Sequence, residues 1–182
     1  MNLPNLISLA RLFSVPVAVW LILDGRLTAA FWLFVVAGLS DAVDGTIAKY
    51  LHAETALGKF LDPLADKALL VSVYIALGRI GEMDSWLVIL VVSRDIMIVG
   101  GVIVTLLTVM RSYKVAPSFL SKANTAAQIL LAAAVLARLG LGIDDLGAAQ
   151  VLTYVVAATT LGSGAWYLVV WYRQMAGVED AQ

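Results

Sequence analysis

The chain has 182 residues, of which 62% are hydrophobic and 14% charged, and its mean hydropathy is +0.93. This composition excludes an ordinary soluble domain and is typical of a polytopic membrane protein. A formal net charge of −1 indicates no basic surface for nucleic acid, and the lack of cysteine excludes disulfides, thiol catalysis and zinc–thiolate sites.

Six apolar segments are long enough to cross a membrane as helices. They are predicted at residues 7–24, 28–50, 59–80, 86–110, 118–139 and 148–172. The runs are too long for strands and do not alternate with polar residues. No Lys or Arg precedes the first segment, so we expect a retained span and not a signal peptide. The sequence therefore predicts one all-α domain over residues 1–182, a polytopic membrane bundle of six transmembrane helices.

The placement of Lys and Arg predicts the orientation of this bundle. Seven basic residues lie on or close to the side that holds both termini, and three lie on the opposite side. The seven are Lys49, Lys59, Arg111, Lys114, Lys122, Arg173 and the nearby Arg11, and the three are Arg26, Arg79 and Arg138. Because cytoplasmic connections are enriched in Lys and Arg, we expect both termini in the cytoplasm and the protein in a bacterial cytoplasmic (inner) membrane.

Four aspartates lie in one short window that ends the second apolar segment and begins the third. They are Asp41, Asp44, Asp62 and Asp66. One Asp at the centre of a transmembrane helix costs roughly 2.5–3.5 kcal/mol, so four require compensation. Spacings of three and four residues put each pair on one helical face. A short connection predicts that the two helices are antiparallel neighbours, so that the pairs can meet.

Carboxylates without a nearby Cys form a hard, all-oxygen site that suits Mg²⁺ or Mn²⁺. Two such ions can clamp the attacking and leaving oxygens of a phosphoryl displacement. The small residues Gly45, Ala48 and Gly58 lie beside the carboxylates and would allow close packing or the approach of a nucleotide. The residues alone leave open buried polar contacts, a divalent-metal transporter or a metal-stabilised structural subunit. A transporter is disfavoured because its acidic residues should be spread through the depth of several spans.

The aspartate window resembles the signature of the CDP-alcohol phosphatidyltransferase family, D-x2-D-G-x2-A-R-x8-G-x3-D-x3-D. The spacing is the same throughout, and the one departure is Lys49 where the family has Arg. Lys keeps the cation but loses the planar fork of Arg. The N-terminal run Pro4-Asn5-x2-Ser8-x2-Arg11 is also similar to this family, so the resemblance covers nearly the whole chain.

The resemblance implies transfer of a phosphatidyl group from CDP-diacylglycerol to an alcohol, with release of CMP. It implies that Asp41, Asp44 and Asp62 hold two divalent ions, Mg²⁺ or Mn²⁺. Asp66 would contribute to the second ion and act as general base on the acceptor hydroxyl. The residues implied to bind CDP-diacylglycerol are Asn5, Ser8, Gly45, Ala48, Lys49 and Gly58. The expected partners are CDP-diacylglycerol, a lipid or glycerol-phosphate acceptor, membrane lipids and a second copy of the chain in a homodimer, but no nucleic acid.

Arg94, Lys122 and Asn124 are the candidates for binding the acceptor. An intramembrane Arg is a functional candidate by default, although Arg94 could instead pair with Asp95 or a site carboxylate. Asn124 could instead join two helices. The run 117–128 and Ser93-Arg94-Asp95 resemble the cardiolipin-forming branch of the family, whereas the branch that uses glycerol 3-phosphate usually has a second Lys at position 124. We therefore expect phosphatidylglycerol as acceptor, with glycerol 3-phosphate as the alternative, and a shift toward the latter in Asn124→Lys.

Overall fold

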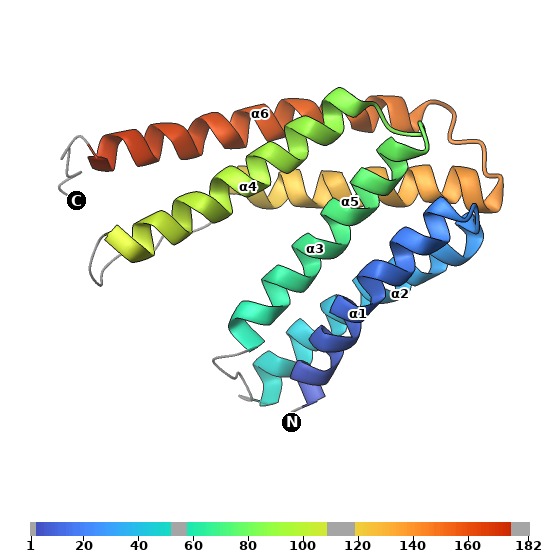
Figure 1. Cartoon of the computed structure of the whole chain (residues 1–182), viewed down its shortest axis with the longest axis horizontal. Coiled ribbons are helices and arrows are strands. Elements are labelled where there is room, and N and C mark those ends of the chain that lie inside the picture. The colour runs from blue at the N-terminus through green and yellow to red at the C-terminus, as the bar shows by residue number, and fades with distance from the viewer. Residues whose placement is uncertain (1–2, 52–57, 109–118, 176–182) are drawn as a thin grey trace.

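The computed structural model describes residues 3–51, 58–108 and 119–175, and within the helices it describes the side chains of residues 9–40, 65, 67–98, 100, 119–170 and 172. All regular elements in these ranges are α-helices (Figure 1). They are α1 (Leu3–Leu23), α2 (Leu27–Leu51), α3 (Gly58–Arg79), α4 (Ser85–Thr108), α5 (Phe119–Leu141) and α6 (Ala148–Met175). Each predicted segment holds one helix whose ends agree to within about a turn, which confirms the all-α prediction for the described part of the chain.

Glycines end α1 and α3 in the same way. Gly25 and Gly81 have φ of 74° and 81°, a left-handed conformation that is strained for residues with a Cβ. The following amides, of Arg26 and Glu82, donate to the carbonyls five residues back, at 2.8 and 3.0 Å. This is the Schellman motif, which satisfies carbonyls that a helix end leaves unpaired. The first and third predicted segments therefore end near these glycines because each glycine allows a local helix-ending motif.

The helices run alternately in opposite directions, so that the ends of α1, α2 and α3 around the aspartate window lie on one side of the molecule (Figure 1). Helix α1 packs along α3 and α2, α5 packs against α2 and α6, and α4 packs against α6. In the described part of the chain, α2 and α3 have no comparable contact with each other, because α1 borders both. Among the described residues, α2 and α3 therefore each pack more extensively on α1 than on each other.

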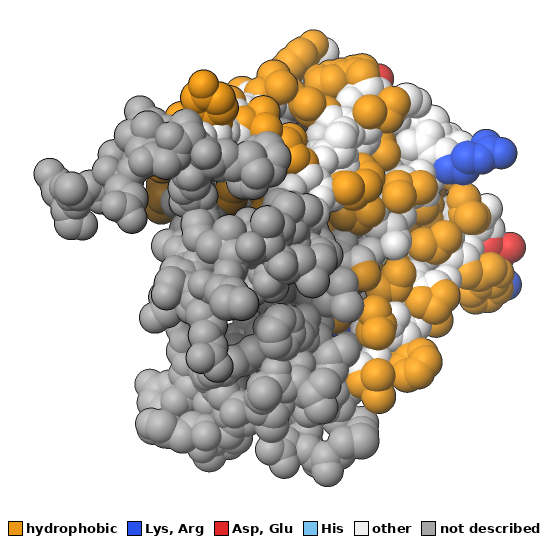
Figure 2. Space-filling model, turned by 60° about the vertical axis from the view of Figure 1, so that its left-hand side comes forward, with side chains coloured by type: hydrophobic (Ala, Val, Ile, Leu, Met, Phe, Trp, Pro, Cys, Tyr) orange, Lys and Arg blue, Asp and Glu red, His pale blue; other side chains and the backbone are white. Residues whose placement is uncertain are grey.

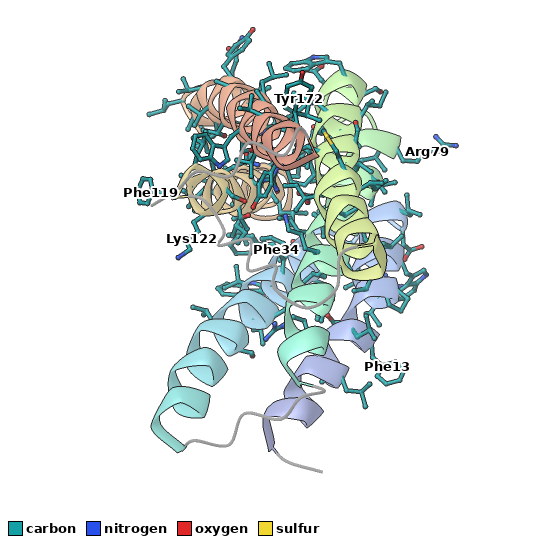
Figure 3. The ribbon with its side chains drawn as sticks, turned by 90° about the vertical axis from the view of Figure 1, so that its left-hand side faces the viewer. Phe13, Phe34, Arg79, Phe119, Lys122 and Tyr172 are labelled. Carbon is teal, nitrogen blue, oxygen red and sulfur yellow. The ribbon has the colours of Figure 1, made fainter. Side chains whose placement is uncertain are left out.

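The outer surface of the described helices is apolar, while polar groups lie inside. Phe13 and Phe119 are 67% and 86% exposed and point away from the bundle (Figure 3). On the face shown in Figure 2, hydrophobic side chains dominate the described surface and charged ones lie near its margin. The buried polar or charged residues are Arg11, Arg94, Asp95, Asn124, Gln128, Thr160 and Ser163. Many exposed large apolar side chains together with buried charged residues are unusual for a water-soluble protein and suit a lipid environment.

Two of the described helices are clearly long and apolar enough to cross a membrane. These are α5 and the part of α6 from Ala148 to Val170. Shorter apolar stretches occupy Leu9–Leu23 and Leu27–Ser40. Two segments are therefore able to cross a membrane by length and composition, and the six transmembrane spans stay a prediction.

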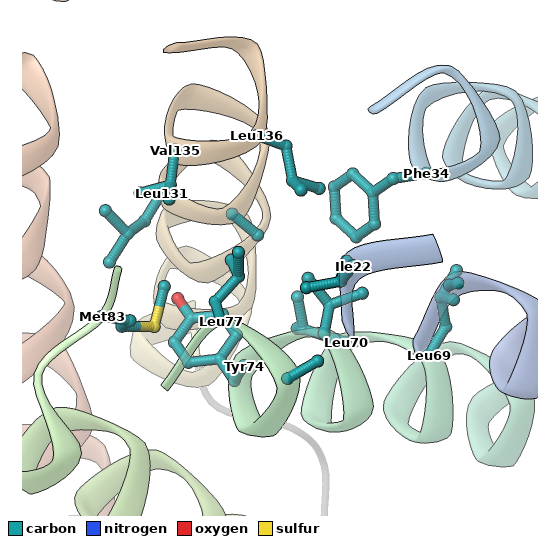
Figure 4. Close-up of a cluster of buried hydrophobic side chains, with 14 of the residues drawn as sticks. Ile22, Phe34, Leu69, Leu70, Tyr74, Leu77, Met83, Leu131, Val135 and Leu136 are labelled. Carbon is teal, nitrogen blue, oxygen red and sulfur yellow. The ribbon is translucent and has the colours of Figure 1, made fainter. Parts of the chain in front are cut away.

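The core lies where α3 crosses α1, α2 and α5. Tyr74 and Leu77 of α3 are completely buried, and Ile22, Phe34 and Leu136 pack around them from the three other helices (Figure 4). The Tyr74 hydroxyl donates to the backbone carbonyl of Gln128 at 3.0 Å, which satisfies its polar atom inside the core. This packing fixes α3, the helix whose first turns carry Asp62 and Asp66.

Candidate active site

The four aspartates of the sequence window lie on two helix ends that point to the same side of the molecule. Asp41 and Asp44 belong to the last three turns of α2, and Asp62 and Asp66 to the first turns of α3. Two views show these ends together with the start of α1 at one side of the bundle (Figures 1 and 3). The side chains of these aspartates lie outside those that the structure describes, and the described side chains form no other group of three acidic, His or Cys residues suited to a metal.

The residues predicted to bind CDP-diacylglycerol belong to the same three helix ends. Asn5 and Ser8 lie in the first turns of α1, Gly45, Ala48 and Lys49 lie in the last turns of α2, and Gly58 begins α3. Their side-chain positions also fall outside the described set. The backbone thus brings their elements to one side of the bundle, while their contacts with a nucleotide stay predictions.

A cavity of about 440 Å³ adjoins this side, between α1, α2, α3 and α5. Its wall on α2 reaches Leu39, two residues before Asp41, and its wall on α3 begins at Lys67, directly after Asp66. Most of the lining is apolar. The lining residues are Arg11, Phe34, Val35, Ala37, Gly38, Leu39, Lys67, Leu69, Leu70, Thr125, Ile129 and Ala133. The cavity therefore continues from the backbone positions of the aspartate window into the apolar interior of the bundle.

Among the described residues, two cations and one hydroxyl form the polar part of the cavity wall. Arg11 of α1 is only 5% exposed, Lys67 comes from α3, and Thr125 comes from α5. No carboxylate belongs to the described lining. Because a phosphate is attracted to such cations and an acyl chain to the apolar remainder, the lining suits an amphiphile with an anionic head.

An ion-pair network lies directly behind Lys67. Its ammonium group donates to both carboxylate oxygens of Asp95 on α4, at 2.9 and 2.8 Å. Arg94 donates from Nη1 to Asp95 Oδ1 at 2.8 Å. Asp95 is therefore a buried carboxylate held between two cations, which offsets the cost of placing its charge inside the bundle.

Arg94 also joins α4 to α5 and α6. Its Nη2 donates to Ser121 Oγ at 2.6 Å, and its Nε donates to Ser163 Oγ at 3.1 Å. The guanidinium lies 5.8 Å from the centroid of the Tyr167 ring, within the range of a cation–π contact. The pairing with Asp95 that the sequence left open is thus confirmed, and three of the five donors of Arg94 are used inside the protein.

Asn124 makes the interhelical contact that the sequence left open. Its Oδ1 accepts hydrogen bonds from the hydroxyls of Thr159 and Thr160 on α6, at 2.8 and 2.9 Å. Lys122, two residues earlier on α5, is exposed and points away from the helices (Figure 3). The structure therefore does not gather the three predicted acceptor residues into one pocket: Arg94 and Asn124 face other helices, and Lys122 faces outward.

Arg11 and Lys67 are the cavity residues that sequence reasoning did not select as ligands. Arg11 entered the sequence analysis through the orientation of the bundle and through the N-terminal run, and Lys67, which lies within the third predicted segment, was not among the candidate ligands. A signal for Lys67 was present, because a Lys that directly follows the last Asp of the window inside an apolar segment needs a counter-charge. The counter-charge, Asp95, is 28 residues away in sequence and could not be paired with it from spacing.

The chain belongs to the CDP-alcohol phosphatidyltransferase family, whose model matches residues 1–172. The chain is 36% identical over 193 residues to the chloroplastic CDP-diacylglycerol–glycerol-3-phosphate 3-phosphatidyltransferase 1 of Oryza sativa subsp. japonica, an alignment of 96% of this chain and 58% of that protein. It is 35% identical over 181 residues to the CMP-forming cardiolipin synthase of Rattus norvegicus, covering 91% of this chain and 60% of the relative.

A bacterial relative is the CDP-diacylglycerol–glycerol-3-phosphate 3-phosphatidyltransferase of Bacillus subtilis (strain 168). It is 36% identical over 150 residues, which cover 74% of this chain and 76% of that protein. By contrast, the chain spans less than two thirds of the length of the rice and rat relatives. The relatives carry names of two different acceptor branches at nearly equal identity, so overall similarity does not separate the two acceptors.

Proposed function

We propose that this protein is a metal-dependent phosphatidyltransferase of phospholipid biosynthesis, which moves the phosphatidyl group of CDP-diacylglycerol to an alcohol and releases CMP. The observation that carries the proposal is the position of the aspartate window beside the cavity that contains Arg11 and Lys67. The four carboxylates supply the charge and the hard oxygen donors that Mg²⁺ or Mn²⁺ requires, so the donor set fits two divalent ions. The two cations of the cavity supply charge for phosphate.

In this proposal Asp41, Asp44 and Asp62 hold the ions, and Asp66 completes the site of the second. The bound ions would neutralise the charge of the diphosphate. Asp66 takes the proton of the acceptor hydroxyl as the acceptor oxygen bonds to the phosphorus that bears the diacylglycerol. The bond from that phosphorus to the bridging oxygen breaks, and CMP leaves. Lys49 and the backbone at Gly45 and Gly58 border the diphosphate, and Ala48, Asn5 and Ser8 complete the pocket.

Phosphatidylglycerol is the acceptor that we propose, with cardiolipin as the product. The apolar lining of the cavity is compatible with an acceptor that carries acyl chains, because hydrocarbon can pack against it without desolvating polar groups. Glycerol 3-phosphate is the second candidate, supported by the rice and Bacillus relatives that are named for it. Arg94, Lys122 and Asn124 stay proposals as acceptor residues, and the contacts of Arg94 and Asn124 favour a supporting role.

We further propose that the chain forms one domain of six transmembrane helices, with both termini and the active site on the cytoplasmic side of a bacterial inner membrane. The apolar exterior and the excess of Lys and Arg on the side of the termini support this arrangement. CDP-diacylglycerol would then reach the site from the cytoplasmic leaflet. A homodimer is part of the proposal and is tested by the mass of the purified protein in detergent.

An assay of the purified full chain tests the function. The protein is incubated with CDP-diacylglycerol, Mg²⁺ or Mn²⁺, and either phosphatidylglycerol or glycerol 3-phosphate, and the lipid products are identified by mass. We expect metal-dependent CMP release and more cardiolipin than phosphatidylglycerophosphate. CMP release with only phosphatidylglycerophosphate as product would select the second acceptor. No CMP release with either acceptor would refute the transferase, and metal uptake into vesicles would then support transport.

The role of Asp66 is tested in the same assay. We expect Asp66→Asn to retain most CDP-diacylglycerol binding, because three metal-holding aspartates are unchanged, and to stop transfer, because Asn cannot take a proton. Binding is measured without acceptor by titration of the purified variant. Transfer at the wild-type rate would remove the base role, whereas loss of binding would assign Asp66 to metal holding alone.

A further inference from the structure

Lys67 is the one charged group of its ion-pair network that the cavity can reach. Its side chain is 31% exposed, whereas the side chains of Asp95 and Arg94 are 6% and 4% exposed. Lys67 also belongs to the cavity lining, which neither of the other two does. Any ligand in the cavity therefore meets the ammonium group of Lys67 with the carboxylate of Asp95 behind it.

Asp95 holds this ammonium group in a defined place. A Lys side chain has a flexible four-carbon stem, and fixing it in one conformation costs up to about 2 kcal/mol of conformational entropy. The bonds from Nζ to both oxygens of Asp95 fix it before a ligand arrives. Asp95 in turn is fixed by Arg94, whose Nε and Nη2 are bonded to α6 and α5. The position of the Lys67 ammonium is thus set by three helices besides its own.

Two cations, Lys67 and Arg11, lie on the described wall of the cavity. One carboxylate, Asp95, is shared between Lys67 and Arg94, and Arg11 contributes a further cation from α1. Thr125 is the polar lining residue of α5, and the described lining from α2 has no charged group. An ammonium has three donors, of which Asp95 occupies two, so Lys67 can donate to one more oxygen.

We propose that Lys67 binds a phosphate oxygen of a substrate in the cavity and that Asp95 is its positioning residue. The inference rests on the proposed function and names a phosphate-binding group for it. The phosphate belongs either to the diphosphate of CDP-diacylglycerol or to the phosphate-bearing acceptor. Both sources have the same chemistry, and the kinetics of the two substrates separate them. Lys67 directly follows Asp66, so the proposed phosphate-binding group and the proposed general base belong to the same turn of α3.

The test compares wild type with Lys67→Met, Lys67→Arg, Asp95→Asn and Asp95→Glu in the full chain. KM and kcat are measured for CDP-diacylglycerol at saturating acceptor and for the acceptor at saturating CDP-diacylglycerol. Binding of CDP-diacylglycerol, and separately of phosphatidylglycerol, is measured without turnover by fluorescence titration. Glu82→Gln is the control, because it breaks an ion pair with Arg138 (2.9 Å) that lies outside the cavity lining.

We expect Lys67→Met to raise KM and the dissociation constant of one substrate by about ten- to hundredfold, the range of a hydrogen bond to a charged group. If KM and the dissociation constant rise for CDP-diacylglycerol, Lys67 binds its diphosphate. If they rise for the acceptor, Lys67 binds the acceptor phosphate. Lys67→Arg should recover most of the affinity. Asp95→Asn should raise the KM of the same substrate, and Asp95→Glu should raise it less. In the double variant Lys67→Met/Asp95→Asn, the KM should be close to that of Lys67→Met alone. Glu82→Gln should leave both KM values unchanged.

Unchanged KM and dissociation constants in Lys67→Met would overturn the proposal, even if its melting temperature falls. Equal loss of kcat in all four variants without a change in KM would also overturn it and leave the network a structural one. A different result would refute the proposed function, namely no CMP release by the wild-type protein. In that event the titrations with the two lipids still decide whether Lys67 binds a phosphate.

Discussion

At the scale of single residues, two buried amides show how α5 is fixed in the bundle. Asn124 and Gln128 are fully buried one turn apart, and Asn124 Oδ1 accepts from two hydroxyls of α6. The amide nitrogen of Asn124 and both polar side-chain atoms of Gln128 have no hydrogen-bond partner among the described residues. Buried polar groups without partners cost about 1–3 kcal/mol each, so this part of α5 tolerates little further polar change.

The buried position of Asn124 changes what we expect from Asn124→Lys. A Lys there places an unpaired ammonium between α5 and α6, which costs about 3–5 kcal/mol. We therefore expect a lower melting temperature and less folded protein in detergent, and no clean shift toward glycerol 3-phosphate. Asn124→Ala should lose less stability, because it buries no charge. If Asn124→Lys melts like wild type and prefers glycerol 3-phosphate, the acceptor role predicted from the sequence stands.

The aspartate window gives a second prediction at this scale. Asp41→Asn, Asp44→Asn and Asp62→Asn should each abolish CMP release, because Asn keeps the size of the side chain but removes the charge that holds a divalent ion. Excess chelator should have the same effect on wild type, and added Mg²⁺ or Mn²⁺ should reverse it. CMP release at the wild-type rate in chelator, or in any of the three variants, would contradict the metal assignment.

At the scale of elements, the end of α5 approaches the start of α2 very closely. A Cβ at Gly140 would lie 2.7 Å from the carbonyl oxygen of Leu27 and 2.8 Å from the amide nitrogen of Thr28. The Thr28 hydroxyl also donates to the carbonyl of Gly140. These contacts involve backbone atoms, which cannot rotate away as a flexible side chain can. The register of α2 on α5 therefore depends on the absence of a side chain at position 140.

We expect Gly140→Ala to destabilise the fold by about 1–3 kcal/mol, the usual cost of overpacking a tight contact. The measurement is the melting temperature of the purified protein in detergent. Gly100→Ala is the matched control, because Gly100 lies within α4 and a Cβ there would meet nothing within 4 Å. The control should be neutral or slightly stabilising, since Ala favours helix more than Gly. Equal melting temperatures for both variants would show that α2 and α5 can shift apart.

The sequence predicted the helices well because their signals are local. Apolar length defines each span, and Gly25 and Gly81 mark the ends of α1 and α3. The helix neighbours were harder to predict, because a short connection brings the ends of α2 and α3 to one side but does not reveal that α1 borders both. The pairing of Lys67 with Asp95 was out of reach for the same reason, since it depends on how α3 and α4 face each other.

At the scale of the whole molecule, the described helices expose many large apolar side chains and bury several polar and charged ones beside an apolar core. Trp20, Trp32 and Ile89 are more than half exposed, while Arg11 and Arg94 are buried. Exposed apolar side chains are unfavourable in water, so such a surface is stable where lipid hydrocarbon surrounds the helices. The alternating helices put the aspartate window and the connection at residues 142–147 at different ends of the bundle, which the proposed orientation assigns to opposite sides of the membrane.

Because the natural chain has no cysteine, single introduced cysteines can report this orientation. We expect Asp144→Cys to react with a membrane-impermeant maleimide added outside intact cells. Phe119→Cys, at the opposite end of α5, should react only after the membrane is opened. Labelling is read by the mass of the purified protein. The reverse pattern would place the aspartate window outside the cytoplasm, and equal labelling of both in intact cells would contradict a spanning α5.

In the proposed arrangement of six spans, the adjacent charges of Arg94 and Asp95 also bear on how α4 enters the bilayer during synthesis. Helix α4 emerges before α5 and α6, so the serines that later contact Arg94 are not yet present. The two side chains lie 2.8 Å apart and can neutralise each other within α4 itself. An isolated Arg or Asp at mid-helix would each oppose insertion by roughly 2.5–3.5 kcal/mol. Arg94 and Asp95 would thus enter the bilayer as a neutral pair, and α4 would have an internal counter-charge before α5 and α6 are inserted.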